Sequence, residues 1–180
     1  MNIVRKLLMV IGVLILIPVV AMATLSVSTR NSDGPSTVFA GGRLVAGELV
    51  TGPEPDWTFV RNIGTIELQL LDPPRSRLIW VAESEGKMYV VSGYMSSTIG
   101  RLWKRWPAQA ERDGRAIVRI DGKRYERHLV RIMAGSEVEG VTAEFNRKYR
   151  AGLTPATIET GTTWLFELAP PDSDVSGSLR

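Results

Sequence analysis

The feature that most restricts what this chain can form is an uncharged apolar run near its beginning. Residues 7–25 read LLMVIGVLILIPVVAMATL and contain no charged side chain, and Arg5 and Lys6 come directly before them. About 20 apolar residues suffice to cross a bilayer as a helix. A buried core helix is a poor alternative, because nothing polar interrupts the run. The sequence therefore predicts a membrane-targeting segment over residues 1–25.

Two fates of this segment are open. It is either an uncleaved transmembrane anchor or a signal segment cut at the small-residue pattern AMA of residues 21–23. Positive residues next to a membrane segment favour the cytoplasmic side, so Arg5 and Lys6 predict a cytoplasmic N-terminus. The rest of the chain is then expected outside the cytoplasm. It is held at the membrane by residues 7–25, or is secreted or periplasmic if the segment is cleaved.

Composition limits the function of the remaining sequence. The chain has 180 residues, of which 44% are hydrophobic and 23% charged, so one globular domain beside the N-terminal segment is expected. Without Arg5 and Lys6 there remain 20 basic and 19 acidic residues, a balance that argues against nucleic acid as a partner. The chain contains no cysteine, and its single histidine, His128, cannot supply the three or four ligands that a zinc site needs. No metal is therefore expected.

The chain divides into a linker, one domain and a tail. Residues 26–36 are polar and contain the breaker Gly34-Pro35, which predicts a short linker. The domain is predicted over residues 37–169, and its first part, residues 37–65, favours one irregular strand or hairpin. The tail, residues 170–180, follows a proline pair, is polar and is expected to be flexible.

Strand patterns dominate the domain. Alternating apolar residues predict a strand over residues 66–70, and two further runs at 77–82 and 88–91, joined by a turn with Gly86, complete an antiparallel meander. A hairpin is predicted around Asp121-Gly122. Its strands cover residues 115–120 and 124–132, and residues 162–168 predict a closing strand.

Helical signals lie between the strands. Ser96 or Ser97 fits the N-cap of a short helix whose apolar face would carry Trp103 and Trp106, and Pro107 would then restart a turn. A second helix is predicted from a capping box, Ser136 with Glu139, to a stop at Gly152. No helix of ten residues separates consecutive strands, so parallel crossovers are not expected. The fold class is mainly β (α+β), an antiparallel barrel with peripheral helices.

The segments IELQL, IWVAESEGKMYVVSGY, LWKRWPAQAERDGRAIVRIDGKRYERHLVRI and NRKY together resemble the split β-barrel family. Its members include FMN-binding pyridoxamine-phosphate-oxidase-like proteins and deazaflavin (F420)-dependent nitroreductase-like proteins. The resemblance covers roughly residues 66–168. It implies a split β-barrel, FMN or F420 as cofactor, an oxidoreductase activity and a homodimer.

The resemblance also implies which residues hold the cofactor, through basic and hydroxyl side chains and backbone amides. Carried over by position, these residues are Arg75, Ser76, Arg77, Trp80, Ser92, Tyr94, Ser96, Ser97, Trp103, Lys104 and Arg105. The catalytic residues are unknown, since the cofactor itself would transfer the hydride. The family's Gly-Arg-Lys-Ser-Gly turn is replaced here by residues 72–77, DPPRSR, which contain no glycine.

Two functions therefore stay open. One is a membrane-tethered oxidoreductase that binds a flavin or deazaflavin, and the other is a cofactor-free binding or structural module of the cell envelope. The block of residues 101–131, with ten basic and four acidic residues, is an anion-binding site, a membrane-binding surface or merely the solvated face of the hairpin. The five tryptophans fit core positions better than ligand contacts.

Overall fold

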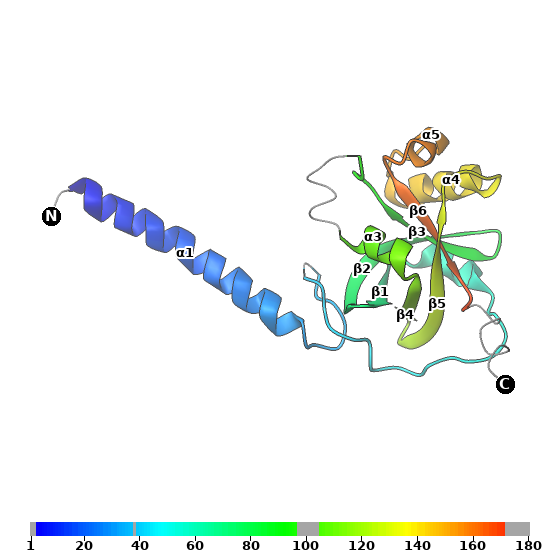
Figure 1. The fold of residues 1–180 in the computed structure, drawn as a ribbon, viewed down its shortest axis with the longest axis horizontal. Coiled ribbons are helices and arrows are strands. Elements are labelled where there is room, and N and C mark those ends of the chain that lie inside the picture. Colours follow the sequence, from blue (N-terminus) through cyan, green and yellow to red (C-terminus); the bar gives the residue numbers. More distant parts are fainter. Residues whose placement is uncertain (1–2, 38, 97–104, 172–180) are drawn as a thin grey trace.

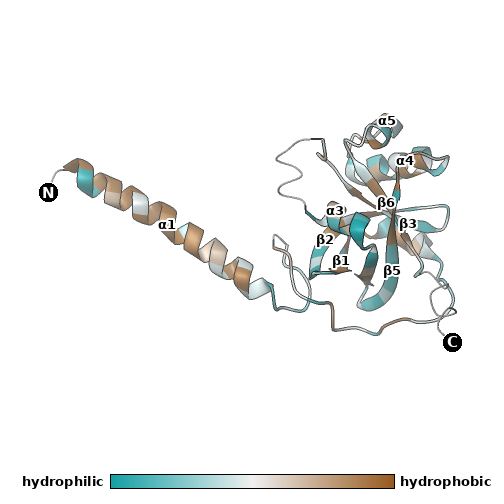
Figure 2. Cartoon of the chain, viewed as in Figure 1, coloured by the Kyte–Doolittle hydropathy of each residue, from teal (hydrophilic) through white to brown (hydrophobic). Residues whose placement is uncertain are grey.

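The computed structural model describes residues 3–37, 39–96 and 105–171. It consists of a long N-terminal helix, α1 (Ile3–Thr29), which projects from a small β-barrel with short helices on its outside (Figure 1). No residue of α1 is buried, and the helix is hydrophobic along nearly its whole length (Figure 2). Its 27 residues make a helix about 40 Å long. Among the described residues, α1 is the helix long and apolar enough to cross a membrane.

Six antiparallel strands form the barrel. They are β1 (Thr65–Leu71), β2 (Pro74–Ser84), β3 (Lys87–Ser92), β4 (Arg115–Ile120), β5 (Lys123–Ile132) and β6 (Trp164–Ala169). The sheet closes in the order β1-β2-β3-β6-β5-β4 and back to β1. The predicted fold class, an antiparallel barrel with peripheral helices behind an apolar N-terminal helix, is confirmed.

Local sequence patterns explain the meander and the hairpin. In β1, Ile66, Leu68 and Leu70 are buried in the barrel interior, as their alternation predicted. The β4–β5 hairpin turns at Asp121 and Gly122, both with positive φ, which is the backbone that an Asp-Gly turn provides. β6 pairs with both β3 and β5 and so closes the barrel.

In the described part of the chain, four short helices lie outside the strands: η1 (Trp57–Asn62), α3 (Trp106–Arg112), α4 (Glu137–Tyr149) and α5 (Pro155–Glu159). Trp57 of η1 and Trp106 of α3 belong to the main core inside the barrel. A second apolar cluster lies between the outer face of the sheet and α4. It contains Tyr89, Val141 and Phe145.

Ser136 is the N-cap residue of α4 as predicted, but the predicted capping bond and the predicted stop at Gly152 were wrong. Ser136 makes no side-chain capping bond, because its own backbone is already helical, with φ −65° and ψ −26°. Capping requires an extended backbone; the acidic residues of the first turn, Glu137 and Glu139, favour the helix start instead. At the other end, Arg150 rather than Gly152 takes the left-handed conformation that ends the helix, with φ 51°.

Residues 39–56 do not form the predicted strand or hairpin. They contribute two isolated bridges, Gly41 with Ser76 and Leu49 with Arg124. Their backbone groups bond to side chains instead: Leu44 N–H donates to Gln69 Oε1 at 2.6 Å, and Arg124 donates to carbonyl groups of Leu44 and Gly47. Of the helix predicted from Ser96 or Ser97, residues 97–104 lie outside the described part, and α3 begins at Trp106.

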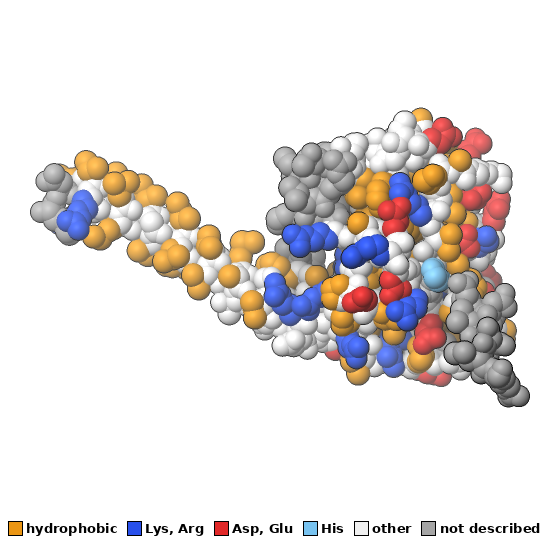
Figure 3. Space-filling view, viewed as in Figure 1, with side chains coloured by type: hydrophobic (Ala, Val, Ile, Leu, Met, Phe, Trp, Pro, Cys, Tyr) orange, Lys and Arg blue, Asp and Glu red, His pale blue; other side chains and the backbone are white. Residues whose placement is uncertain are grey.

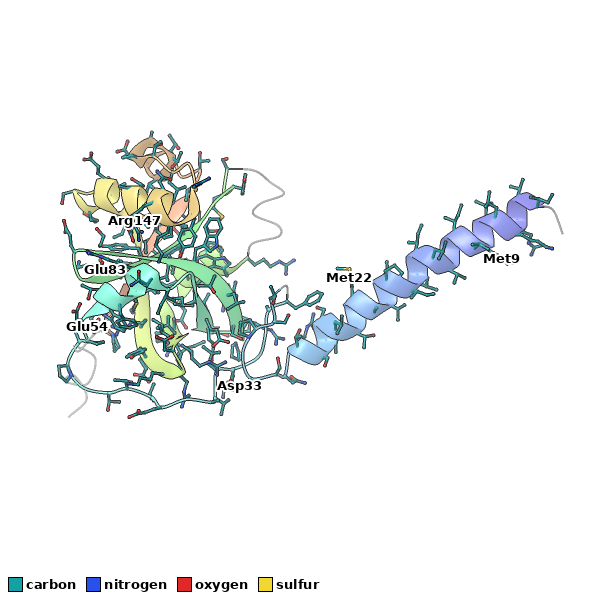
Figure 4. The ribbon with its side chains drawn as sticks, turned by 180° about the vertical axis from the view of Figure 1, so that it is seen from behind. Met9, Met22, Asp33, Glu54, Glu83 and Arg147 are labelled. Atoms are coloured by element: carbon teal, nitrogen blue, oxygen red, sulfur yellow. The ribbon has the colours of Figure 1, made fainter. Side chains whose placement is uncertain are left out.

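The segment after α1 packs on the barrel through Asp33. Its carboxylate accepts hydrogen bonds from Val45 N–H at 2.8 Å and Ala46 N–H at 3.1 Å. Arg119 of β4 pairs with the same carboxylate and with Glu67 of β1. Figure 4 shows Asp33 between the end of α1 and the barrel. The chain that follows the apolar helix is therefore fastened to the domain from Asp33 onward.

Candidate functional site

The barrel has a seam between β2 and β3. These strands pair only from Val81–Val90 to Ser84–Lys87. Before Val81, β2 continues along β1 alone, and after Val90, β3 continues along β6 alone. The two strands thus separate at one end, although both remain in the closed sheet.

A cleft of about 780 Å³ lies along this seam. Its walls include residues 77–80 of β2 and residues 91–94 at the end of β3, which face each other across the separation. The end of α4 and the loop after it, residues 149–153, form a third wall, and Trp106 of α3 also contributes. The cleft therefore joins the β2–β3 seam to α3 and to the end of α4, which come from later parts of the sequence.

The end of α4 fixes the β2 wall. Val81 N–H donates to Tyr149 Oη at 3.2 Å, and Lys148 Nζ donates to Val81 O at 2.6 Å. The ring of Tyr149 stacks on Trp80, with centroids 4.6 Å apart and planes 5° from parallel. In a strand, the N–H and C=O groups of one residue point to one edge, and those of the next residue point to the other edge. The backbone groups of Val81 are bonded to the end of α4. The backbone groups of the preceding residue, Trp80, therefore point to the opposite edge of β2, which borders the seam.

Arg77 is the main charged group of the cleft. Its guanidinium lies over the ring of Trp106, 5.7 Å from the ring centroid, and its Nε is buried without a hydrogen-bond partner among the described residues. Burial lowers the pKa of Arg77 from 12.5 to about 10, so it stays protonated at neutral pH. Arg150 adds a second cation, and no Asp or Glu is among the described residues that line the cleft. The electrostatics favour an anionic ligand.

Hydroxyl and aromatic groups complete the lining. Ser92 is buried, and its hydroxyl lies 3.5 Å from the sulfur of Met95. Thr163 is also buried. Trp80 and Tyr94 keep 45% and 76% of their surface exposed, and both are lining residues of the cleft. Such a mixture of cations, hydroxyls and aromatic rings suits a ligand with both an anionic and an aromatic part.

The structure brings together four of the residues that the sequence predicted for a cofactor. Arg77, Trp80, Ser92 and Tyr94 all line the cleft. Ser96 and Arg105 are exposed and not among the lining residues, and both border the segment 97–104. Three predicted residues lie outside the described part of the chain: Ser97, Trp103 and Lys104.

Arg75 and Ser76 are separated from this cleft. Arg75 Nη1 donates to Arg30 O at 2.9 Å, toward the end of α1. Ser76 is fully buried, and its backbone exchanges two hydrogen bonds with Gly41, at 2.9 and 3.2 Å. Of the stretch that replaces the family's Gly-Arg-Lys-Ser-Gly turn, Ser76 is thus covered by the chain itself, whereas Asp72 and Pro73 are exposed.

The sequence did not indicate the α4 side of the cleft. Tyr149 and Arg150 come from the segment NRKYR, which contributed to the family resemblance and to the predicted helix but was given no role in a site. Trp106 was predicted as a core residue, and it is both buried and part of the cleft wall. No local pattern relates these residues to Arg77, because only the tertiary contact of α4 with β2 brings them together.

The basic hairpin does not provide an open anion site. Its arginines bond within the molecule: Arg115 to Asp113, Arg119 to Glu67 and Asp33, Arg124 to backbone carbonyls, Arg127 to Glu54 and Arg131 to Glu111. A hollow of about 810 Å³ beside this hairpin is lined by such pairs and by the half-buried His128. In the described residues, no group of three or more His, Cys, Asp or Glu could hold a metal.

This chain is similar to a solved structure but not, at the level of sequence, to a known family. No protein-family model matches the sequence, and no curated protein matches it significantly. A solved structure, that of the conserved hypothetical protein Rv2991 from Mycobacterium tuberculosis, is similar, with 13% identity and a TM-score of 0.47. The alignment covers 68% of this chain and 82% of that one. The split-barrel architecture therefore rests on the strand order and the seam described above.

Proposed function

We propose that the seam cleft binds a phosphate-bearing aromatic cofactor, FMN or F420, and that the protein is a membrane-tethered oxidoreductase. The observation that carries this proposal is the half-buried Arg77, whose buried Nε has no partner among the described residues, in a cleft lined by no acid in the part described. Arginine binds phosphate through paired N–H donors, and such charge-assisted bonds strengthen when water is excluded.

The cleft residues fit both parts of such a cofactor. A volume of about 780 Å³ is within the usual range of ligand pockets. Arg77 and Arg150 would hold the phosphate, and the aromatic side chain of Trp80, which lines the same cleft, is suited to contact an aromatic system. When bound, the cofactor supplies hydride transfer. The protein's part is to orient it and to exclude water, and Trp106 fixes Arg77 for this role by lying against its guanidinium.

One observation favours the second candidate, a cofactor-free binding module of the cell envelope. The backbone N–H of Ser76 is bonded to Gly41 and does not offer itself to a phosphate. The neighbouring residues 72–75 lack the glycines that allow close approach of a backbone. In this alternative the same cleft takes an anionic ligand that undergoes no redox chemistry.

Cofactor binding tests the proposal directly. The full chain, purified from its own host in detergent, should absorb in the visible range, and FMN or F420 should titrate it to saturation in a fluorescence assay. Arg77→Gln should weaken binding by about 10- to 100-fold, the effect of losing a hydrogen bond to a charged group. Arg115→Gln is the matched control, since this exposed arginine pairs with Asp113 away from the cleft. A colourless protein that saturates with neither cofactor would overturn the proposal and support the cofactor-free module.

The proposal includes an orientation. Arg5 and Lys6 support a cytoplasmic N-terminus, with the barrel on the other side. The chain contains no cysteine, so Lys123→Cys creates a single thiol at the exposed β4–β5 turn. A membrane-impermeant maleimide should label this thiol in intact cells. Labelling only after cell lysis would reverse the proposed orientation.

The resemblance also leads us to propose a homodimer. The mass of the detergent-solubilised protein, measured in solution, distinguishes one chain from two.

A further inference from the structure

A second hollow, of about 520 Å³, lies where α1 meets the barrel. It is surrounded by residues 30–33, which follow α1, by the loop around Gly42 and by the turn between β1 and β2. Three arginines line it, Arg30, Arg43 and Arg75. Basic side chains are visible on the surface at this junction (Figure 3). The seam cleft and this hollow share no lining residue.

The fold gathers these arginines from three distant segments. Arg75 Nη1 donates to Arg30 O at 2.9 Å, which joins the β1–β2 turn to the end of α1. Gly42 N–H donates to Ser32 O at 3.0 Å and so brings the neighbouring Arg43 to the same place. Arg30 and Arg43 are exposed, and in the described part of the chain their guanidinium groups have no ion pair. Three cations thus share one open hollow.

The acid in this hollow does not neutralise them. Asp33 accepts hydrogen bonds from the N–H groups of Val45 and Ala46, and Arg119 pairs with it at 2.9 Å. Its carboxylate is therefore directed to the barrel. The hollow keeps an excess of positive charge, in contrast to the β4–β5 hairpin, whose arginines are paired.

The position of Arg30 along the chain sets its depth at a membrane. The apolar run ends at Leu25, and α1 continues to Thr29. Four more helical residues rise about 6 Å. The polar layer on each side of the hydrocarbon core is about 5 to 7 Å thick. With α1 across the bilayer, Arg30 would lie at the level of the lipid headgroups, and the hydrogen bond that Arg75 donates to Arg30 O would hold Arg75 at the same level.

We propose that this hollow binds the phosphate of an anionic phospholipid in the leaflet where α1 emerges. Guanidinium groups bind phosphate through several N–H donors at once, and basic residues beside a membrane segment are attracted to anionic lipid. The bound headgroup fixes the barrel against the membrane surface in one orientation. This inference does not depend on what the seam cleft binds.

Lipid selectivity of the full chain tests this site. The protein is reconstituted in phosphatidylcholine vesicles that contain spin-labelled phosphatidylglycerol or spin-labelled phosphatidylcholine, and the relative association constant of the two labels is measured. The native chain should select phosphatidylglycerol. The triple variant Arg30→Gln, Arg43→Gln, Arg75→Gln should lose most of this selectivity, since one arginine at an anionic surface contributes about fivefold. The single variant Arg43→Gln keeps every hydrogen bond of the junction and should show a partial loss.

Two controls distinguish the site from general charge attraction and from a soluble anion. Arg112→Gln with Lys123→Gln removes two exposed cations outside the hollow and should leave the selectivity unchanged. Arg5 and Lys6 stay intact in every variant, so their own attraction for lipid cancels. Equal selectivity in the native chain and the triple variant would overturn the proposal. Displacement of the labelled lipid by millimolar inorganic phosphate would also overturn it, in favour of a soluble anion.

Discussion

Arg127 illustrates how single residues hold this barrel together. Its side chain is almost fully buried in β5, and Nη1 donates to both carboxylate oxygens of Glu54 at 2.9 Å. Its guanidinium also lies over Trp57, 4.7 Å from the ring centroid. Glu54 in turn accepts a hydrogen bond from the Trp57 indole. One arginine therefore fastens the segment before η1 to the buried face of β5, which also carries Tyr125 and Leu129.

We predict that Arg127→Ala destabilises the protein by about 2 kcal/mol. The substitution removes a charge-assisted pair and a cation–π contact, while Glu54 stays accessible to water and limits the loss. Chemical denaturation of the detergent-solubilised chain measures the change in the free energy of unfolding. Arg112→Ala, at an exposed position of α3, should change it by less than about 0.5 kcal/mol. Equal effects of the two variants would contradict this account.

Asp33 makes the junction sensitive to acid. Burial raises its pKa, but the hydrogen bonds from Val45 and Ala46 and then the contact with Arg119 outweigh burial and lower the pKa below 3.8. A lowered folded-state pKa means that the stabilisation is present above about pH 4 and is lost as the pH falls through the folded-state value. Since the Asp33 side chain is 37% exposed, solvent screening keeps the effect modest.

The expected result is faster amide hydrogen exchange in residues 41–46 once the pH falls below about 4, after correction for intrinsic exchange. Asp33→Asn should remove this extra pH dependence and show the faster exchange already at pH 6. Other carboxylates titrate in both proteins, so only the difference between the two curves is used. Parallel curves for the native protein and the variant would show that Asp33 does not hold this segment.

At the level of elements, the end of α4 combines a structural and a binding role. Lys148 donates to the carbonyls of Val60, Ile63 and Val81, and Tyr149 supports the adjacent β2 wall. The next residue, Arg150, ends the helix with φ 51° and lines the cleft. A helix end that needs glycine-like geometry thus carries a long cationic side chain.

We predict that Arg150→Gly has opposite effects on stability and on anion binding. Glycine removes the strain of a left-handed residue with a Cβ, about 1 kcal/mol, and its greater freedom in the unfolded chain offsets part of this gain. The melting temperature should therefore rise slightly, while affinity for an anionic cofactor should fall several-fold. Thermal unfolding and fluorescence titration measure the two quantities. A variant that is less stable would contradict the role assigned to the backbone at this position.

The whole molecule is a barrel at the end of an apolar helix, and we predict that this helix is retained. The apolar run of residues 7–25 is longer than the 7 to 15 apolar residues usual for a cleaved signal. The mature protein should stay in the membrane fraction after alkaline carbonate washing and have the full mass of 19.9 kDa. A soluble chain that lacks residues 1–23 would show cleavage instead. Mass spectrometry of both fractions distinguishes the outcomes.

Much of the barrel was predictable because its signals are local. Ile66, Leu68 and Leu70 alternate in sequence and share one face of β1, and Asp121-Gly122 specifies its own turn. The predicted strand or hairpin within residues 37–65 failed for a physical reason. Its apolar residues are too irregular to form a sheet edge, and side chains such as Gln69 and Arg124 satisfy its backbone.

The candidate site was predictable only in part. The resemblance pointed to Arg77, Trp80, Ser92 and Tyr94, which lie on or beside the two strands of the seam. It also pointed to Arg75, which the strand geometry directs to the end of α1. A position in a sequence does not reveal which neighbour covers it, and here Gly41 covers Ser76 near the start of β2.

By itself, the sequence determined the apolar helix, the strands and the turns, because hydrophobic periodicity and turn residues act over a few positions. Only the tertiary structure decided the seam and the junction. β2 separates from β3 where α4 binds Val81, and Arg30, Arg43 and Arg75 meet through hydrogen bonds between segments distant in the chain. Such contacts depend on register and packing of the whole barrel, which no local pattern encodes.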